Sequence, residues 1–383
     1  MREPHRMRTF PHRRRLAGAA AFILAGSVVL AACSQGDVPG DDATDDATAT
    51  STDAGEAVES ILVPPAEGQV EYPVTVDTAW GEVTIEERPE RIVAASWRGD
   101  LSWLLALGVT PVAVESAEWA LEAVPWAEEA LAQPIEYTWV GDDLLLEPEP
   151  IAASTPDLIV AGSMGSEPVP NLDQLATIAP VLAQPDTGAA YAGWRENLLL
   201  IGEVLDLQDR AQEVIDGYDA YFEQFRAQYP EFEGNTIAYI GFHGGEWGGF
   251  YGNPPGSIVE EFFSRQGFAE NPAASGFNEN DPISDELVGS IDADVVVVVD
   301  YTVPEDEGRE FGEWVGSPLF QSIPAAQNDH VLIVRSPERT VLYDEDGQEL
   351  GPMPHPSVAY DDPIGSPEFA ELLAPLISET LAR

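Results

Sequence analysis

Residues 294–299 read Asp-Val-Val-Val-Val-Val, and this run decides the fold class. Val has a β-branched side chain that favours strands, and an apolar run without alternation is typical of a strand covered on both faces in a parallel sheet. A second such run, Leu-Ile-Val-Ala, occupies residues 158–161. Stretches with helical periodicity separate the short apolar runs in both halves of the chain. This alternation predicts an α/β protein built from βα units on parallel-rich sheets.

A helical stretch lies between the two series of βα units. Apolar residues recur at steps of three and four over 194–205 and over 209–228. This spacing predicts helices, interrupted near Asp206, with Asp209 capping the second. A helix of about 20 residues is about 30 Å long and reaches from one lobe to another. We therefore expect two βα lobes joined by a long rigid helix. The predicted boundaries are 71–192 for the N-terminal lobe, 193–229 for the connecting helix and 230–383 for the C-terminal lobe.

The N-terminus has the parts of a secretory signal. Six of the 17 Arg precede an apolar run over 16–29, and Leu30-Ala31-Ala32-Cys33 follows. This ending resembles the lipobox of bacterial lipoproteins, so we predict a signal peptide over 1–32 and lipid on Cys33. A single-pass anchor is the alternative, because residues 16–33 approach the about 18 apolar residues of a membrane span. Arg13-Arg14-Arg15 leaves both the Sec and the twin-arginine export route open.

The segment that follows, residues 33–70, is predicted to be a disordered acidic tether. Residues 34–60 contain Asp, Thr, Ala and Gly with almost no large apolar side chain, so nothing there offsets the entropy cost of ordering. Cys33 is the only Cys in the sequence, which excludes a disulfide within the chain and a thiolate metal cluster. We expect the protein to be extracytoplasmic and lipid-anchored to the outer face of the cell membrane.

The charge is strongly negative, at −51 for the whole sequence. Every cationic residue is Arg, and removal of the signal leaves 11 Arg against 67 Asp and Glu. Such a charge argues against nucleic-acid binding and against an electrostatic hold on anionic lipid. The acids are spread along the chain, which favours a role in keeping the protein soluble, notably at high salt.

Six stretches resemble the iron–siderophore and cobalamin class of periplasmic binding proteins, whose lobes are joined by one rigid helix. They are Arg88–Val93, Leu104–Val112, Ile151–Ile159, Leu175–Val181, Ile283–Leu287 and Pro318–Ala325. The matches cover about residues 72–335, and the acidic Gly/Pro-rich tail over 336–363 departs from the pattern. The resemblance implies a ligand cleft between the lobes. It also implies a solute-binding lipoprotein that captures a small-molecule iron chelate, a ferric siderophore, and hands it to the permease of an ABC importer.

Loops at the carboxyl ends of parallel strands are where open α/β sheets bind ligands. Aromatic side chains there can pack on the organic shell of a chelate, and Arg can donate hydrogen bonds to the oxygens that hold ferric iron. Arg98 is the sharpest candidate, because Arg is scarce and this one follows a buried strand. The alternative for each aromatic is packing in the core. The predicted ligand-binding residues are Trp97, Arg98, Met164, Phe242, His243, Trp247, Tyr251, Tyr301 and Arg335.

Two acids match the docking positions of the family, one in each lobe. The resemblance implies that Glu149 and Glu286 meet arginines on the permease and that the protein acts as a monomer. With so many acids in the chain, a merely solvated Glu is the alternative at each position.

A bare metal ion, heme, cobalamin and an enzyme activity are the alternatives to this interpretation. A bare zinc or manganese ion needs about three His or carboxylate ligands, and His243, His330 and His355 lie in different segments. No resident cofactor or metal is therefore expected, while heme and cobalamin stay open as ligands. Gly162-Ser163-Met164-Gly165 resembles a hydrolase nucleophile elbow, with Asp300 and His330 following in the right chain order. Residues 166–170 delay the helix that an elbow requires at once, so we do not expect an enzyme.

Overall fold

The computed structural model describes residues 62–115, 124, 126–139, 146–245, 247–278, 280–302, 308–337, 339–353 and 362–383. The described residues all belong to one compact unit. The predictions for the signal peptide and Cys33, and most of the tether, lie outside the described residues. None of the helices in the described ranges combines the length and apolar character that crossing a bilayer requires.

The N-terminal lobe is built on a five-stranded sheet in which every neighbouring pair is parallel, in the order β5-β4-β3-β6-β7. The run at 158–161 is strand β6, buried throughout, as the sequence predicts. A hairpin of β1 and β2 precedes the sheet. The elements are β1 (Val74–Thr78), β2 (Gly81–Ile85), β3 (Ile92–Ala94), α1 (Asp100–Ala106), β4 (Ala113–Glu115), α2 (Ala127–Ala130), β5 (Tyr137–Trp139), α3 (Pro148–Ala153), β6 (Leu158–Ala161), α4 (Leu172–Leu175) and β7 (Val181–Ala183).

The C-terminal lobe contains a six-stranded sheet in the order β13-β12-β11-β10-β8-β9. Strands β8, β10 and β11 are parallel, while β9, β12 and β13 add antiparallel edges. The tail that departs from the family pattern thus supplies two strands. The elements are β8 (Ile237–Phe242), β9 (Gly249–Tyr251), α7 (Ile258–Gln266), α8 (Asp285–Val288), β10 (Val295–Asp300), α9 (Gly308–Val315), α10 (Pro324–Gln327), β11 (Val331–Arg335), β12 (Val341–Tyr343), β13 (Glu349–Pro352) and α12 (Gly365–Leu381).

The valine run is strand β10 at the centre of this sheet. Val295, Val297 and Val299 belong to the main core, which also contains Phe369 of α12. Val296 and Val298 belong to a second core on the other side, with Phe311 of α9. Alternate side chains of a strand point to opposite faces, so a strand covered on both faces must be apolar at every position. This explains the unbroken run in the sequence.

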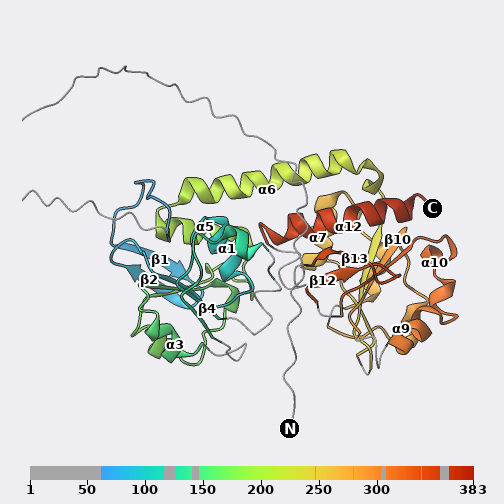
Figure 1. Cartoon of the computed structure of the whole chain (residues 1–383), viewed down its shortest axis with the longest axis horizontal. Helices are drawn as coiled ribbons and strands as arrows, with labels where there is room; N and C mark the ends of the chain where they lie inside the picture. The colour runs from blue at the N-terminus through green and yellow to red at the C-terminus, as the bar shows by residue number, and fades with distance from the viewer. Residues whose placement is uncertain are drawn as a thin grey trace, which may run out of the picture. The chain divides into compact units, whose positions relative to one another are not determined.

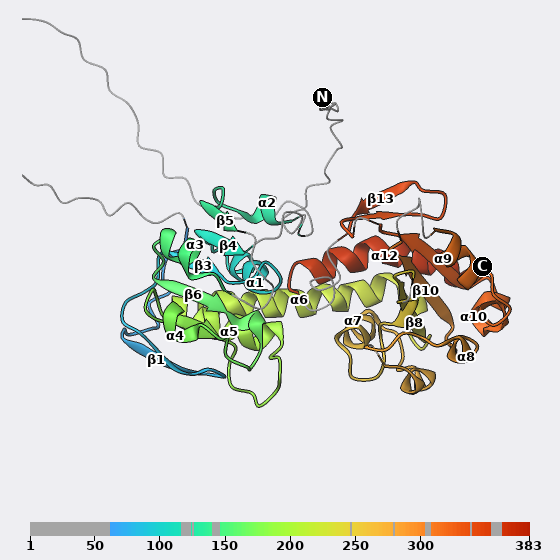
Figure 2. The same ribbon diagram turned by 90° about the horizontal axis from the view of Figure 1, so that it is seen from below.

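The predicted connecting segment is divided into two helices, α5 (Trp194–Leu205) and α6 (Gln208–Gln228). Asp206 between them has a left-handed backbone with φ of 55°. Its carboxylate accepts hydrogen bonds from the backbone N–H groups of Gly68 and Gln69 at 2.8 Å each. Helix α5 packs on α1, whereas α6 contacts α7 and α12 of the C-terminal lobe. Helix α6 is therefore the long element that joins the lobes, and α12 runs beside it (Figures 1 and 2).

The prediction that Asp209 caps the second helix is wrong. Helix α6 begins at Gln208, so the N–H of Asp209 lies in the first turn and itself needs an acceptor. The carboxylate of Glu67 supplies it, accepting from the N–H groups of Asp209 and Arg210 at 2.8 and 2.9 Å. Helix α7 has a side-chain cap, since Ser257 Oγ accepts from Glu260 N at 3.1 Å.

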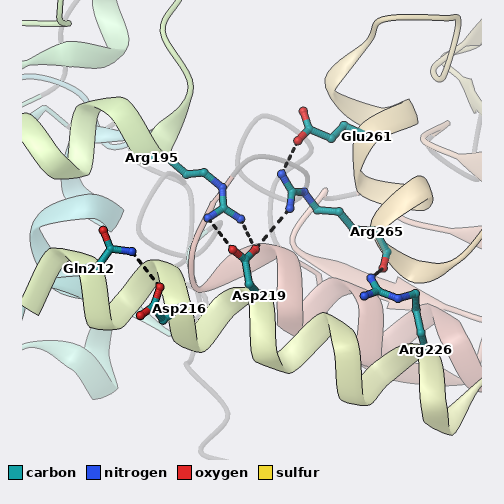
Figure 3. A network of polar contacts seen from close by, with 7 residues as sticks. All are labelled: Arg195, Gln212, Asp216, Asp219, Arg226, Glu261 and Arg265. Carbon is teal, nitrogen blue, oxygen red and sulfur yellow. Dashed lines mark hydrogen bonds and ion pairs between the residues drawn. The ribbon is translucent and has the colours of Figure 1, made fainter.

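One acid on α6 binds arginines from the helices on either side (Figure 3). Asp219 accepts two hydrogen bonds from Arg195 of α5, at 2.5 and 3.3 Å, and pairs with Arg265 of α7 at 3.5 Å. Both guanidinium groups also lie over the ring of buried Tyr218, at 5.1 and 5.5 Å from its centroid. We refer to these four residues as the Asp219 cluster. The cluster ties the joining helix to one helix of each lobe.

Candidate functional site

The parallel strands of the C-terminal lobe end in one row. Asp300 at the end of β10 pairs with Phe242 of β8 on one side and with Arg335 of β11 on the other. The next residues, His243 and Tyr301, therefore lie along the same carboxyl edge. The register explains why three of the predicted residues, His243, Tyr301 and Arg335, come together although they are distant in the sequence.

His243 lies flat on Tyr301 at this edge. The two ring centroids are 4.9 Å apart, with 20° between the ring planes. The hydroxyl of Tyr301 lies 3.2 Å from that of Tyr239, and burial raises the pKa of Tyr301 well above its ordinary value. Burial, reinforced by the nearby cation of Arg339, lowers the pKa of His243 to about 4. Both rings are therefore uncharged at neutral pH.

Arg339 lies beside His243 and Tyr301 and was not predicted from the sequence. Its Nη2 lies 3.2 Å from His243 Nδ1, and its guanidinium lies 5.4 Å from the Tyr301 ring centroid. The backbone of Arg339 is left-handed, with φ of 59°, which is uncommon for a residue other than Gly. Arg339 belongs to the tail that departs from the family pattern, so no motif pointed to it. The scarcity of Arg, which pointed to Arg98, is the sequence feature that could also have pointed to Arg339.

Arg335 is oriented by a buried acid. Its Nε lies 3.7 Å from Oδ2 of Asp300, whose other oxygen accepts from the N–H and hydroxyl of Thr302 at 3.0 and 2.7 Å. Asp300 is only 2% exposed, whereas the Arg335 side chain is 37% exposed. The buried carboxylate forms a long ion pair with one side of the guanidinium, and the Arg335 side chain remains partly accessible at the carboxyl edge.

The other predicted aromatics of this lobe differ in exposure. Phe242 is 3% exposed and packs against Phe311, and Tyr251 is 1% exposed and stacks on Phe277 with centroids 4.3 Å apart. These positions match the core-packing alternative for both residues. Trp247, by contrast, is 63% exposed, and its ring is available at the surface.

The N-terminal lobe brings two predicted loops together through a buried acid. Asp100, fully buried at the start of α1, accepts hydrogen bonds from Ser96 N at 3.1 Å and from Ser163 N at 2.8 Å. Burial raises its pKa to about 7, against the opposing effect of the hydrogen bonds from Ser163 and Ser96. Asp100 was also missed, although it follows directly on the predicted loop. It joins the segment after β3 to the segment after β6.

These two loops carry the remaining predicted ligand-binding residues. Arg98 is exposed, and its guanidinium lies 5.7 Å from the ring centroid of Trp97. Trp97 itself is 1% exposed and belongs to the main core, which again matches the packing alternative. Met164 is half-buried against the same core. Arg98 and Met164 are therefore the accessible candidates of this lobe.

The two predicted docking acids are both exposed. Glu149 lies in the first turn of α3 in the N-terminal lobe, and Glu286 lies in the first turn of α8 in the C-terminal lobe. Each side chain is thus accessible to a partner protein.

The residues considered for a hydrolase triad are not assembled. Val331 pairs with Val296, at the opposite end of β10 from Asp300. His330, which precedes Val331, is therefore separated from Asp300 by several residues at about 3.3 Å each. Its Nδ1 is bound to Asp294 O at 2.9 Å, and Ser163 follows a strand of the other sheet. Within the described ranges, no group of three or more His, Cys, Asp or Glu could hold a metal ion, and His355 lies outside them.

Similarity to known proteins extends across both lobes. The model of the periplasmic binding protein family matches residues 92–338. The "Probable siderophore-binding lipoprotein YfiY" of Bacillus subtilis (strain 168) is 28% identical over 265 residues, 64% of this chain and 74% of that protein. The Fe(3+) dicitrate-binding periplasmic protein FecB of Escherichia coli (strain K12) is 29% identical over 171 residues, 44% of this chain and 53% of that protein. A periplasmic solute binding protein from Mycobacterium smegmatis has a TM-score of 0.60 at 26% identity, covering 80% of this chain and 98% of its own.

Proposed function

The chain belongs to the periplasmic binding protein family, and we propose that it binds a ferric siderophore chelate and delivers it to an ABC-importer permease. The observation that carries the proposal is the row of His243, Tyr301, Arg335 and Arg339 at one carboxyl edge. The cations and rings of this row suit a solute that arrives already chelated. The names of the sequence relatives, a siderophore-binding lipoprotein and an iron dicitrate-binding protein, support the same ligand class.

The chemistry of the accessible side chains fits such a solute. Guanidinium groups donate paired hydrogen bonds to carboxylate, hydroxamate or catecholate oxygens, and they keep their charge at all relevant pH values. Arg335 and Arg339 offer such donors in the C-terminal lobe, and Arg98 offers another in the N-terminal lobe. The exposed ring of Trp247 can pack on the organic shell of the chelate.

The rest of the transport cycle is proposed on the same basis. Lipid on Cys33 would hold the protein at the outer face of the cell membrane, close to its permease. Glu149 and Glu286 would meet the permease, one from each lobe, with the protein acting as a monomer and catalysing no reaction. Metabolic labelling with palmitate tests the anchor: label should enter the wild-type protein and be lost in Cys33→Ser.

Quenching of intrinsic Trp fluorescence tests the ligand class. The purified full chain is titrated with ferric complexes of citrate, a trihydroxamate and a tricatecholate, and with heme and cobalamin. Saturable quenching by a ferric chelate is expected, with a weaker response to the iron-free chelator. Binding of heme or cobalamin alone would contradict the proposed ligand class, and no response to any compound would contradict the proposed function.

A further inference from the structure

We infer that Arg339 fixes His243 as a neutral hydrogen-bond donor through Nε2, so that His243 recognises an oxygen of the chelator rather than the metal. The inference rests on the proposed function for the class of solute. It deepens that proposal by assigning a chemical role to one side chain and by separating chelate recognition from heme coordination.

The assignment of the proton follows from the chemistry of Arg. A guanidinium has only N–H donors and no acceptor, and it is not deprotonated in proteins. Since Arg339 Nη2 lies 3.2 Å from His243 Nδ1, Nδ1 must be the acceptor and can carry no hydrogen. The one hydrogen of the neutral ring is then on Nε2. A doubly protonated imidazolium would place two N–H groups against each other.

The surroundings of His243 hold the ring in this orientation. Tyr301 stacks on one face, and Phe250 meets the ring edge-on at 5.6 Å. A Cβ at position 241 would lie 3.3 Å from His243 Nε2 and 3.1 Å from Tyr301 Cε2, so Gly241 leaves the room in which the two rings lie flat. No hydrogen bond joins Nε2 to another of the described residues, and the His243 side chain is only partly buried. Its N–H is therefore available to a solute.

The charged groups around His243 come from several elements. Arg339 faces Nδ1, and the Asp300–Arg335 pair lies at the ends of the neighbouring strands. Glu310 of α9 is engaged by the backbone N–H of Gly245 at 2.7 Å. The hydroxyl of Tyr239 lies 3.2 Å from that of Tyr301. Among the described residues, the charged group in contact with the ring is thus a cation, which opposes protonation.

Arg339 is aimed at His243 by a turn that is fixed to β10. The N–H of Ser336 donates to Asp300 O at 2.8 Å, and the Ser336 hydroxyl donates to Val341 O at 2.9 Å. The N–H of Arg339 donates to Ser336 O at 3.1 Å. These bonds hold Arg339 in its left-handed conformation, which L residues seldom adopt. The turn thereby sets the position of the guanidinium relative to the ring.

The hydrogen bond at His243 Nδ1 runs in the opposite direction to the one that normally supports a metal-binding His. A metal ligand normally donates its second N–H to a carboxylate or carbonyl, which increases the basicity of the coordinating nitrogen. His243 instead accepts from a cation, which withdraws electron density and repels a metal ion. The site therefore suits a solute that presents carboxylate, hydroxamate or catecholate oxygens around a metal that is already fully coordinated.

Nitrogen NMR of the imidazole rings tests the tautomer without any ligand. The full chain is labelled with ¹⁵N-His, and the signals of His243 are identified by their loss in His243→Phe. A single neutral Nε2–H tautomer is expected between pH 5.5 and pH 8. In Arg339→Met the ring should become protonated at higher pH than in the wild type, whereas Arg335→Met, which removes a nearby cation without a bond to the ring, should keep the tautomer. An Nδ1–H tautomer or an imidazolium in the wild type at pH 7 would overturn the inference.

Binding provides the second measurement. The gallium(III) complexes of citrate, a trihydroxamate and a tricatecholate replace the ferric ones, because gallium is diamagnetic and does not broaden the signals. His243→Phe keeps the stacked ring but lacks the donor, so affinity for the bound chelate should fall about 3- to 10-fold, the worth of one hydrogen bond. Unchanged affinity, or a heme absorption band that depends on His243, would overturn the inference about His243 but not the proposed function. Failure of the wild type to bind any chelate would overturn the proposed function, while the tautomer still decides the role of Arg339.

Discussion

Arg195 of α5 and Asp219 of α6 face each other in a two-bond fork, with Nη2–Oδ1 and Nη1–Oδ2 distances of 2.5 and 3.3 Å. The same carboxylate is shared with Arg265 of α7, so one acid pairs with cations from both lobes. Fork geometry constrains orientation as well as distance. Together with the packing of both guanidinium groups on Tyr218, this arrangement favours a largely preformed binding site with modest lobe movement.

Replacing this acid should weaken the junction between the lobes. In Asp219→Asn two Arg lose their shared counter-ion, and since partly exposed ion pairs contribute about 0.2–1 kcal/mol each, the free energy of unfolding should fall by about 1 kcal/mol. The loss should shrink at 1 M NaCl, where salt screens the pairs. Thermal unfolding at low and high salt measures both effects.

The matched control is one turn earlier on the same helix. Asp216→Asn makes the same change of charge, but Asp216 is bound by Gln212 at 2.8 Å and belongs to no ion pair in the described residues. Equal destabilisation by the two variants would show that the Asp219 cluster contributes nothing beyond net charge.

The buried acid of the N-terminal lobe should make stability depend on pH. Burial raises the pKa of Asp100 from 3.8 to about 7, so the folded protein binds more protons than the unfolded chain between these values. The stability contributed by this group therefore falls as pH rises from about 4 to about 7, with a slope of at most about 1.4 kcal/mol per pH unit, and levels off above.

A neutral side chain removes this dependence. Asp100→Asn should gain stability relative to the wild type as pH increases from 5 to 8, in thermal unfolding at each pH. Asp173→Asn, at an exposed position of α4, is the control for net charge. A constant difference between Asp100→Asn and the wild type across this range would contradict the proposed titration.

The two long apolar runs could be predicted from the sequence because their reason is local. Val295–Val299 and Leu158–Ala161 are covered on both faces, so every position had to be apolar. The cap of α6 could not be predicted from a local pattern. The carboxylate of Glu67 accepts a hydrogen bond from the N–H of Asp209, and the two residues are 142 positions apart in the sequence. Strands β12 and β13 were not predicted for a similar reason: they are short, and they form by pairing at a sheet edge.

The residues of the candidate site could likewise be predicted from the sequence only in part. The carboxyl-edge rule located His243, Tyr301 and Arg335, since strand ends can be found from apolar runs. It did not separate exposed from buried side chains, and Trp97 is buried in the main core one residue before exposed Arg98. Arg339 depends on a left-handed turn fixed by contacts with Asp300, which no local pattern reveals.

Removal of the exposed arginine in the N-terminal lobe should weaken chelate binding. If Arg98 makes a charged hydrogen bond to the ligand, Arg98→Ala should cost about 1–3 kcal/mol in affinity. Arg98→Lys should recover only part of this, because an ammonium lacks the planar fork. Fluorescence titration measures both, with Arg226→Ala as a control, since that guanidinium is bound to Arg265 O at 2.8 Å in the joining region. Affinity unchanged in Arg98→Ala would remove Arg98 from the site.

The two proposed docking acids should affect transport without affecting ligand binding. Charge reversal at Glu149 and Glu286 places cations opposite the arginines expected on the permease, and like charges across an interface suppress association. The double variant Glu149→Arg, Glu286→Arg should therefore keep the wild-type affinity for the chelate while cellular uptake of the radioactive iron complex falls at least tenfold. Glu213→Arg, at an exposed position of α6, controls for charge reversal on the acidic surface. Loss of uptake in the Glu213 variant as well would assign the effect to overall charge, and normal uptake in the double variant would exclude both acids from docking.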